Sequence, residues 1–194
     1  MKILVATKNR HKLWEIQDIL GCDTEVFSAF ETLNINDDID ESGQTFEENA
    51  KIKALYISNF TKEYVLADDS GLEVFAINNA PGVHSARYAG IRATDLENNT
   101  KLLNEMEHID DRRGRYVCVL ALAKDGNIVS TFTGTLEGKI AYLPKGTNGF
   151  GYDPIFELED GRTVAEVGPS EKNRISHRYR ALVKLKEYLK NLRG

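Results

Sequence analysis

The chain has 194 residues, which is enough for one domain with a substantial hydrophobic core. Its net charge of -5 argues against a non-specific nucleic-acid binder, which would be basic, and no apolar run is long enough to cross a bilayer. Cys22 and Cys118 are far apart and form no CxxC motif, so neither a disulfide framework nor a zinc site is suggested. The N-terminus lacks the apolar core of a signal peptide, and we therefore expect a soluble cytoplasmic protein.

A polar, basic loop follows the first expected strand, residues 2–6, and precedes an amphipathic helix. Backbone N–H groups at such a junction point toward a bound anion, and the helix dipole adds to the attraction. The loop contains no Walker A motif, and a solvated basic turn would explain the same residues. Its candidate phosphate-binding residues are Thr7, Lys8, Asn9, Arg10, His11 and Lys12.

An acidic loop, residues 37–43, precedes the second expected helix. Thr45 and Glu48 have the spacing of a capping box, which predicts that this helix begins at residue 46 and carries Lys53. Most of the acidic loop is expected to be solvated surface. We keep Glu41 from this loop as a candidate metal ligand.

Two adjacent carboxylates, Asp68 and Asp69, end an apolar run that begins at Tyr64 and suits a buried strand. We expect Ser70-Gly71 to break this strand. Side chains alternate between faces in a regular strand, but at a strand end both acids could approach one site. Two acids at such a place are costly unless Mg²⁺, Lys or Arg accompanies them. A polar turn capped by Asp68 is the alternative.

A helix and a hairpin are expected in the middle of the chain. Thr94 and Glu97 form a second capping box. The helix that follows is expected to turn one stripe toward the core, made of Leu96, Leu103 and Met106. Residues 115–123 predict a strand, Asp125-Gly126-Asn127 predicts a turn, and residues 128–135 predict the return strand.

A glycine-rich stretch, residues 144–154, carries Phe150 between Gly149 and Gly151. The flanking glycines would let the backbone approach a ligand closely while the ring is presented. A flat ring beside polar groups suits a nucleobase. A tight turn with Phe150 as part of the core is the alternative.

A closing helix is expected to start near Ser176, with His177, Arg178 and Arg180 in its first turn. Cations there oppose the helix dipole, and an anionic or carbonyl-bearing ligand would compensate for this. A solvated basic cluster held by neighbouring acids is the alternative. Helix and strand signals interleave along the chain, which predicts an α/β protein with a mixed sheet.

Five short motifs occur in order along nearly the whole chain: Thr7-x-Asn9-x-x-Lys12, Ala67-Asp68-Asp69-Ser70-Gly71-Leu72, Pro81-Gly82-x-x-Ser85-Ala86-Arg87-Tyr88, Gly149-Phe150-Gly151-Tyr152-Asp153-Pro154 and Ser176-His177-Arg178. Together they resemble the inosine triphosphate pyrophosphatase family, also called XTP/dITP diphosphatases. Lys8 departs from the pattern, because many relatives carry glycine there.

The resemblance implies an elongated mixed β-sheet flanked by helices, with two lobes around a central active-site cleft, in a single domain over residues 1–194. It implies hydrolysis of XTP, ITP and dITP to the monophosphate and pyrophosphate, which keeps deaminated purines out of DNA and RNA. It also implies Mg²⁺ as the cofactor and a homodimer. We expect neither nucleic acid nor a membrane as a partner.

The residue chemistry agrees with that reaction, which needs charge neutralisation, metal bridging and an activated water. Asp69 is the expected general base, and Asp69, Asp68 and Glu41 are the expected metal ligands. The expected substrate-binding residues are those of the 7–12 loop together with Lys53, Ser70, Phe150, Gly151, Tyr152, Asp153, Lys172, His177 and Arg178. Lys12 and Lys53 would hold the triphosphate, Phe150 would stack on the base, and Asp153 would face its polar edge.

Two other functions remain open. The protein could be a nucleotide-binding sensor without turnover, although a pure binder does not need the water-activating acids Asp68 and Asp69. It could also be a phosphatase that releases orthophosphate.

Overall fold

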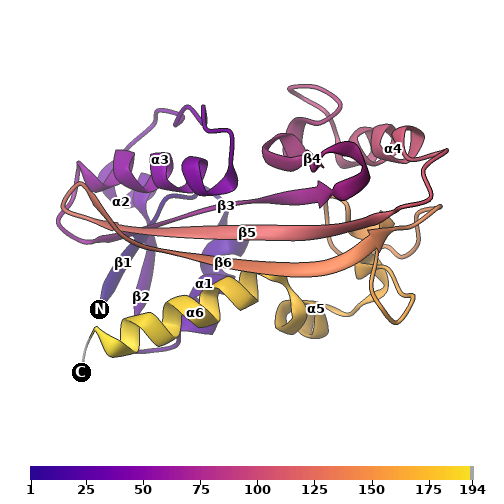
Figure 1. The fold of residues 1–194 in the computed structure, drawn as a ribbon. Coiled ribbons are helices and arrows are strands. Elements are labelled where there is room, and N and C mark those ends of the chain that lie inside the picture. Colours follow the sequence, from indigo (N-terminus) through magenta and orange to yellow (C-terminus); the bar gives the residue numbers. More distant parts are fainter. Residues whose placement is uncertain (193–194) are drawn as a thin grey trace. The chain divides into compact units, whose positions relative to one another are not determined.

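The computed structural model describes residues 1–192, which form a mixed α/β fold (Figure 1). Within these residues the strand order is β2-β1-β3-β5-β6-β7, and β4 pairs with β3. β1 pairs in parallel with β2 and β3, whereas β4 and β7 pair antiparallel to their neighbours. The predicted fold class, α/β with a mixed sheet flanked by helices, is therefore confirmed.

The strands are β1 (Lys2–Val5), β2 (Glu25–Ser28), β3 (Tyr64–Val74), β4 (Ala80–Pro81), β5 (Arg113–Lys124), β6 (Asn127–Ile140) and β7 (Phe156–Glu157). The α-helices are α1 (Arg10–Leu20), α2 (Ala29–Leu33), α3 (Phe46–Ser58), α4 (Asp95–Glu105), α5 (Pro169–Ile175) and α6 (His177–Asn191). Short 3₁₀ helices are η1 (Phe75–Ile77), η2 (Gly82–Arg87), η3 (Asp153–Ile155) and η4 (Val164–Glu166).

The chain divides into two compact units, in agreement with the two predicted lobes. Unit 1 comprises residues 1–69, 118–134 and 178 onward, and unit 2 comprises residues 70–117 and 135–177. The strands β3, β5 and β6 each contribute residues to both units. The central cleft and the single domain stay predictions.

The core of unit 1 forms where α1 and α6 pack on the sheet. Ile16 of α1, Leu66 of β3 and Leu185 of α6 are fully buried members of one hydrophobic cluster. α3 lies on the opposite side of the strands from α1 and α6 (Figure 1). Thr45 and Glu48 make the expected capping box at its start, so this helix was predicted correctly.

β3 runs without a break from Tyr64 to Val74, so the expected interruption at Ser70-Gly71 is wrong. Leu72 and Val74 beyond the glycine are fully buried, and Glu73 and Val74 pair with β4. Burial and pairing of these residues outweigh the local preference of Ser-Gly for a turn. The two acids therefore lie within a regular strand.

The predicted hairpin between β5 and β6 is confirmed, although both strands are longer than expected. Asp125 and Gly126 both have positive φ, at 50° and 74°. Two such residues are the requirement of a type I′ turn, whose twist matches that of the flanking strands.

Unit 2 has its own hydrophobic cluster, to which Leu102 of α4 and Met106, the residue after α4, belong. Leu96 was expected there, but 74% of it is exposed, so that part of the predicted stripe is wrong. The buried face of α4 is defined by Asn98, Asn99 and Leu102, and Met106 continues it directly after the helix. Polar side chains thus occupy inward positions that a purely apolar criterion overlooks.

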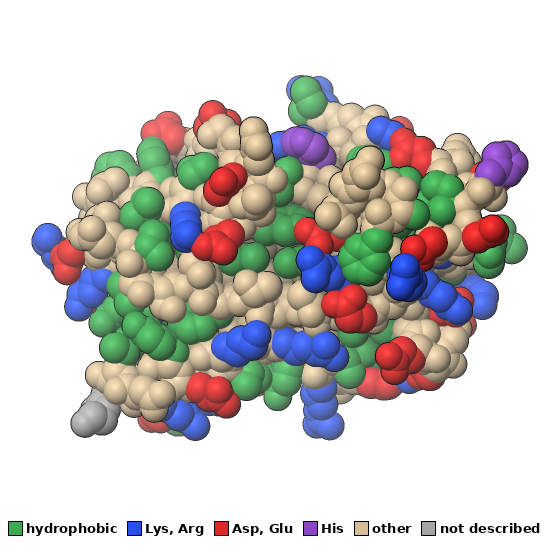
Figure 2. Space-filling model, viewed as in Figure 1, with side chains coloured by type: hydrophobic (Ala, Val, Ile, Leu, Met, Phe, Trp, Pro, Cys, Tyr) green, Lys and Arg blue, Asp and Glu red, His purple; other side chains and the backbone are tan. Residues whose placement is uncertain are grey.

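Figure 2 shows acidic and basic side chains interspersed on one face, with apolar side chains between them. No helix among residues 1–192 is long and apolar enough to cross a membrane. The expected absence of a nucleic-acid partner and the cytoplasmic location stay predictions.

Two leucines of α4 give a matched test of this packing. Leu102→Ala should lower the free energy of unfolding by about 2–5 kcal/mol, because it empties a filled core position. Leu96→Ala in the same helix should change it by no more than about 0.5 kcal/mol. Denaturant unfolding of the two variants checks the expectation, and equal losses would contradict the described face of α4.

Candidate functional site

The loop between β1 and α1 is held by its own side chains. Thr7 Oγ1 accepts a hydrogen bond from the backbone N–H of Asn9 at 3.1 Å. Asn9 Oδ1 accepts one from the backbone N–H of Lys12 at 3.3 Å, which is the geometry of a helix N-cap. These bonds fix the start of α1 and the direction in which Lys12 leaves it.

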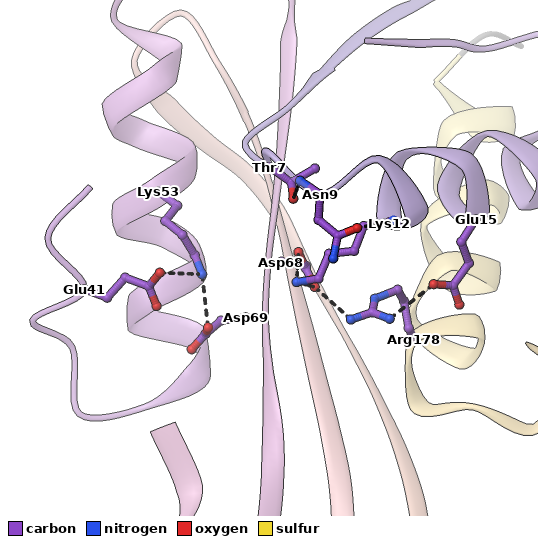
Figure 3. A network of polar contacts seen from close by, with 9 residues as sticks. All are labelled: Thr7, Asn9, Lys12, Glu15, Glu41, Lys53, Asp68, Asp69 and Arg178. Carbon is purple, nitrogen blue, oxygen red and sulfur yellow. Dashed lines mark hydrogen bonds and ion pairs between the residues drawn. The ribbon is translucent and has the colours of Figure 1, made fainter. Parts of the chain in front are cut away.

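Asp68 is the centre of a buried charge network (Figure 3). Lys12 Nζ donates to both of its carboxylate oxygens, at 3.1 and 3.0 Å. Arg178 Nη2 lies 3.3 Å from Asp68 Oδ2, and Arg178 Nη1 lies 3.2 Å from Glu15 Oε2. Two cations therefore face two carboxylates, which makes this group neutral.

The network keeps Asp68 ionised. Burial opposes the charge on Asp68, but Lys12 and Arg178 outweigh it and hold the pKa of Asp68 well below its usual range. Burial likewise opposes the charge on Arg178, yet Asp68 and Glu15 hold the pKa of Arg178 above its usual value. Asp68 thus acts as a counter-ion that orients Lys12, and it is a poor proton acceptor at neutral pH.

Asp69 belongs to a different group, because successive residues of a regular strand point to opposite faces. Lys53 Nζ of α3 lies 3.0 Å from Asp69 Oδ1 and 3.3 Å from Glu41 Oε1 (Figure 3). Asp69 Oδ2 is buried and has no hydrogen-bond partner among the described residues 1–192. Burial raises the pKa of Asp69 although Lys53 opposes the shift, so this carboxylate suits the acceptance of a proton.

The structure does not assemble the predicted set of three metal ligands. The oxygens of Asp68 are taken by Lys12 and Arg178, and residues 1–192 hold no group of three acidic, His or Cys side chains placed for a metal. Asp69 and Glu41 do come together around Lys53. The unpartnered Asp69 Oδ2 fits an oxygen-preferring cation such as Mg²⁺, which stays a prediction.

A second cluster, in unit 2, surrounds Asp153. Its Oδ2 accepts from the backbone N–H of Phe150 at 2.9 Å and from Lys172 Nζ, and its Oδ1 accepts from Tyr116 Oη at 3.2 Å. Lys172 Nζ lies 4.4 Å from the centre of the Phe150 ring. The ring of His177 stacks on that of Tyr116 with centroids 5.0 Å apart. Asp153 therefore joins the predicted residues Phe150 and Lys172 directly, and it is linked to His177 through Tyr116.

Phe150 is 67% exposed, so the alternative that it belongs to the core is wrong. Gly149 has φ of 81°, and a Cβ added there would lie 2.0 Å from Asp153 Oδ2. Glycine is therefore required at this position by the close approach of Asp153. The exposed ring is consistent with stacking on a flat ligand.

Other candidates from the 7–12 loop lie at the surface. Lys8 pairs with Asp38 at 2.8 Å, and Arg10 pairs with Glu31 at 3.5 Å. His11 is within α1, but its side chain lies outside the described part of the structure. The predicted roles of these residues in binding phosphate stay untested.

Tyr152 and Ser70 are placed inside unit 2. Tyr152 is buried and its hydroxyl donates to the Ser85 carbonyl at 2.8 Å, so its side chain anchors the loop. Ser70 is half-buried in β3. The substrate contacts predicted for both residues, and for Gly151, stay predictions.

Two residues of these clusters were missed from the sequence. Glu15 lies three residues after Lys12 in α1, so its place on the same helix face could have been recognised. Tyr116 lies in the apolar strand β5, where no local signal marks it as the partner of Asp153.

The fold and these two polar clusters define an α/β protein of a known class. A model described as the Ham1 family matches residues 3–188, and the chain belongs to that family. It is 46% identical to a dITP/XTP pyrophosphatase of Bacillus licheniformis over 97% of each chain, and 44% identical to one of Staphylococcus epidermidis over 96% and 95% of the two chains. The family resemblance seen in the sequence is confirmed.

Solved structures agree with this assignment. The Ham1 protein of Staphylococcus aureus superposes with a TM-score of 0.92 at 39% identity, covering 98% of this chain and 99% of that one. A HAM1 protein from Coxiella burnetii gives the same TM-score at 44% identity and the same coverage.

Replacing Asp68 should reveal its role as a counter-ion. Asp68→Asn should lower the free energy of unfolding at neutral pH by about 3–5 kcal/mol, because it leaves buried cations uncompensated. The folded-state pKa of Asp68 is lowered, so its contribution is present above the ordinary value of 3.8 and is lost as pH falls below that value. Unfolding of wild type and variant at a series of pH values should show a difference that shrinks in acid.

The exposed Asp40, on the acidic loop, provides the control: Asp40→Asn should match wild type throughout. A difference between wild type and Asp68→Asn that does not change with pH would contradict the assignment.

Proposed function

We propose that this protein hydrolyses dITP, XTP and ITP to the nucleoside monophosphate and pyrophosphate. Membership of the Ham1 family and the similarity to proteins named dITP/XTP pyrophosphatases support the proposal. The observation that carries it is the half-buried Asp69, with a raised pKa, a buried Oδ2 that has no hydrogen-bond partner among residues 1–192, and the neighbours Lys53 and Glu41. The proposal includes Mg²⁺ as cofactor, a homodimer, a cytoplasmic location, and a role in keeping deaminated purines out of DNA and RNA.

In the proposed reaction, water attacks the α-phosphorus and loses its proton to the carboxylate of Asp69. The bond from the α-phosphorus to the oxygen that bridges to the β-phosphorus breaks, and pyrophosphate leaves with the bonding electron pair. Mg²⁺ held by Asp69 and Glu41 would supply charge neutralisation at the phosphates. Lys53 lies against both carboxylates and keeps them in place.

The triphosphate is bound by Lys12, Lys53 and the backbone N–H groups of the 7–12 loop in this proposal. Lys12 has three N–H donors, and its ammonium group is oriented by Asp68. The group of Lys12, Arg178, Asp68 and Glu15 is neutral as a whole, so the attraction for an anionic ligand at this end of α1 comes from the N–H donors of Lys12 and from the start of the helix.

The base is selected in this proposal by the cluster around Asp153. Its carboxylate has about four lone-pair positions, of which the donors Phe150, Lys172 and Tyr116 use three. The remaining position can accept the N1–H of a 6-oxo purine, whereas adenine presents an acceptor at N1. In the proposal, His177 or Arg178 donates a hydrogen bond to the 6-oxo group. Adenine carries an amino group at this position, so the donor would be left without an acceptor when adenine is bound.

One assay separates this function from the two alternatives. The protein is incubated with dITP, XTP, ITP, ATP and GTP, with Mg²⁺ or with a chelator, and pyrophosphate and orthophosphate are measured separately. The expected result is that pyrophosphate is released from dITP, XTP and ITP in the presence of Mg²⁺. Orthophosphate would indicate a phosphatase, and binding without either product would indicate a sensor.

Asp69→Asn tests the proposed base, because it keeps the shape of the side chain but removes its charge. We expect kcat/KM for dITP to fall by at least roughly 10²–10⁴-fold, with the fold retained. Because the pKa of Asp69 is raised, the acid limb of the wild-type kcat/KM profile should lie above the ordinary value of 3.8. Asp40→Asn serves again as the control, and near-normal turnover by Asp69→Asn would refute the assignment.

Phe150→Ala tests the proposed stacking. It should weaken binding of all purine nucleotides together by roughly 1–3 kcal/mol, because every purine presents a similar face to the ring. The ratio of kcat/KM for ITP to that for ATP should stay close to wild type. Phe60 is another exposed phenylalanine, in unit 1, and Phe60→Ala should leave binding unchanged. A changed ITP-to-ATP ratio would mean that Phe150 contributes to reading the base edge.

A further inference from the structure

The loop that carries Phe150 is bonded to α4 at a single residue. The backbone N–H of Gly151 donates to Asp95 Oδ2 at 2.6 Å, and Asn99 Nδ2 donates to the Gly151 carbonyl at 3.0 Å. Asp95 and Asn99 are four residues apart in α4, so they lie on the same face of the helix. We call these two side chains and their bonds the Gly151 clamp.

The clamp acts at a place where the backbone would otherwise be free to move. Gly149 and Gly151 have φ of 81° and 62°, and apart from the adjoining residues no atom of the described chain lies within 4 Å of a Cβ added at Gly151. A glycine in open space has more accessible conformations than any other residue. Bonds to both polar groups of Gly151 restrict that freedom on the C-terminal side of Phe150.

The other side of the ring is held by Asp153. It accepts from the backbone N–H of Phe150 at 2.9 Å, and its own backbone N–H donates to the Phe150 carbonyl at 3.3 Å. Four backbone groups of residues 150 and 151 are therefore bonded. The side chains of Asp95, Asp153 and Asn99 thus hold the backbone at residues 150 and 151. This backbone in turn sets the direction of the exposed Phe150 ring.

Asn99 is unusual among the residues of the clamp, because it is only 6% exposed and its Oδ1 is buried without a hydrogen-bond partner in the part of the chain that the structure describes. An unsatisfied buried oxygen destabilises the fold, and an apolar residue would avoid it. Leu102 of the same helix and Met106, directly after it, occupy the next inward positions. The amide of Asn99 can donate a hydrogen bond to Gly151, whereas an apolar side chain at this position could not.

We propose that Asp95 and Asn99 are positioning residues that fix the ring of Phe150 in the orientation needed for stacking on the purine base. They act through Gly151 and do not touch the nucleotide. Pre-ordering the ring removes an entropic cost from binding, so the effect falls on affinity for the base. The inference rests on the proposed function, since it takes Phe150 as the stacking residue.

The test measures the Kd for dITP by calorimetry without metal, together with kcat and KM with Mg²⁺. Asp95→Ala and Asn99→Ala should each raise Kd and KM by roughly 2–10-fold, as expected for loss of one hydrogen bond, and leave kcat near wild type. Inhibition by inorganic triphosphate, which has no base, should not change. Asn104→Ala is the control, because Asn104 is an exposed asparagine of the same helix.

Asp95→Asn separates positioning from helix stability. It keeps an oxygen that can accept from Gly151 but removes the charge that favours the start of α4, so its Kd should stay near wild type even if its melting temperature falls. Lower melting temperatures of the alanine variants with an unchanged Kd for dITP would overturn the proposal. Equal weakening of dITP and inorganic triphosphate would also overturn it.

Failure of the proposed function looks different. A wild-type protein that binds dITP without releasing pyrophosphate would refute the proposed hydrolysis, and the Kd values would still decide on the clamp. A wild-type protein that does not bind dITP would refute both.

Discussion

The side-chain alternation of β3 is the constraint on which the chemistry of unit 1 depends. Because the strand stays regular through Asp68 and Asp69, the two carboxylates enter different surroundings. Asp68 meets two cations and its pKa is lowered, whereas burial dominates at Asp69 and its pKa is raised. One peptide unit thus separates a permanent counter-ion from a group able to exchange a proton. A turn at Ser70-Gly71 would have removed this distinction.

Burial of Asp68 also requires the arrangement of charges around it. Lys12 comes from α1 and Arg178 from α6, and Glu15 of α1 completes the pairing of Arg178. A buried ion pair contributes little net stability but penalises any arrangement that leaves one charge alone. The hydrophobic contacts of α1 and α6 with the sheet are less specific, since a core tolerates exchanges between apolar side chains of similar volume. In unit 1 the polar network therefore determines where α1 and α6 lie on the sheet, and the apolar core stabilises that arrangement.

Local signals in the sequence were sufficient for much of the fold. Both capping boxes, the hairpin turn at Asp125-Gly126-Asn127 and the apolar strands were correct, because each depends on residues close together in the chain. Leu96 and the expected break in β3 were wrong, because packing partners distant in sequence decided them. The same division holds for the site. Lys12, Lys53 and Asp69 carry recognisable chemistry, but the pairing of Tyr116 with Asp153 depends on contacts 37 residues apart.

The pairing of Glu15 with Arg178 spans 163 positions of the chain, and unit 1 is assembled from three separate segments. During synthesis from the N-terminus, Asp68 and Lys12 are made long before the arginine that completes their network. Contacts between such distant residues must pay the entropy of closing a long loop before they stabilise anything, which slows folding. Unit 1 therefore cannot reach its final charge balance on the ribosome until Arg178 has emerged, and a nascent chain that stalls before α6 holds Asp68 without one of its two cations.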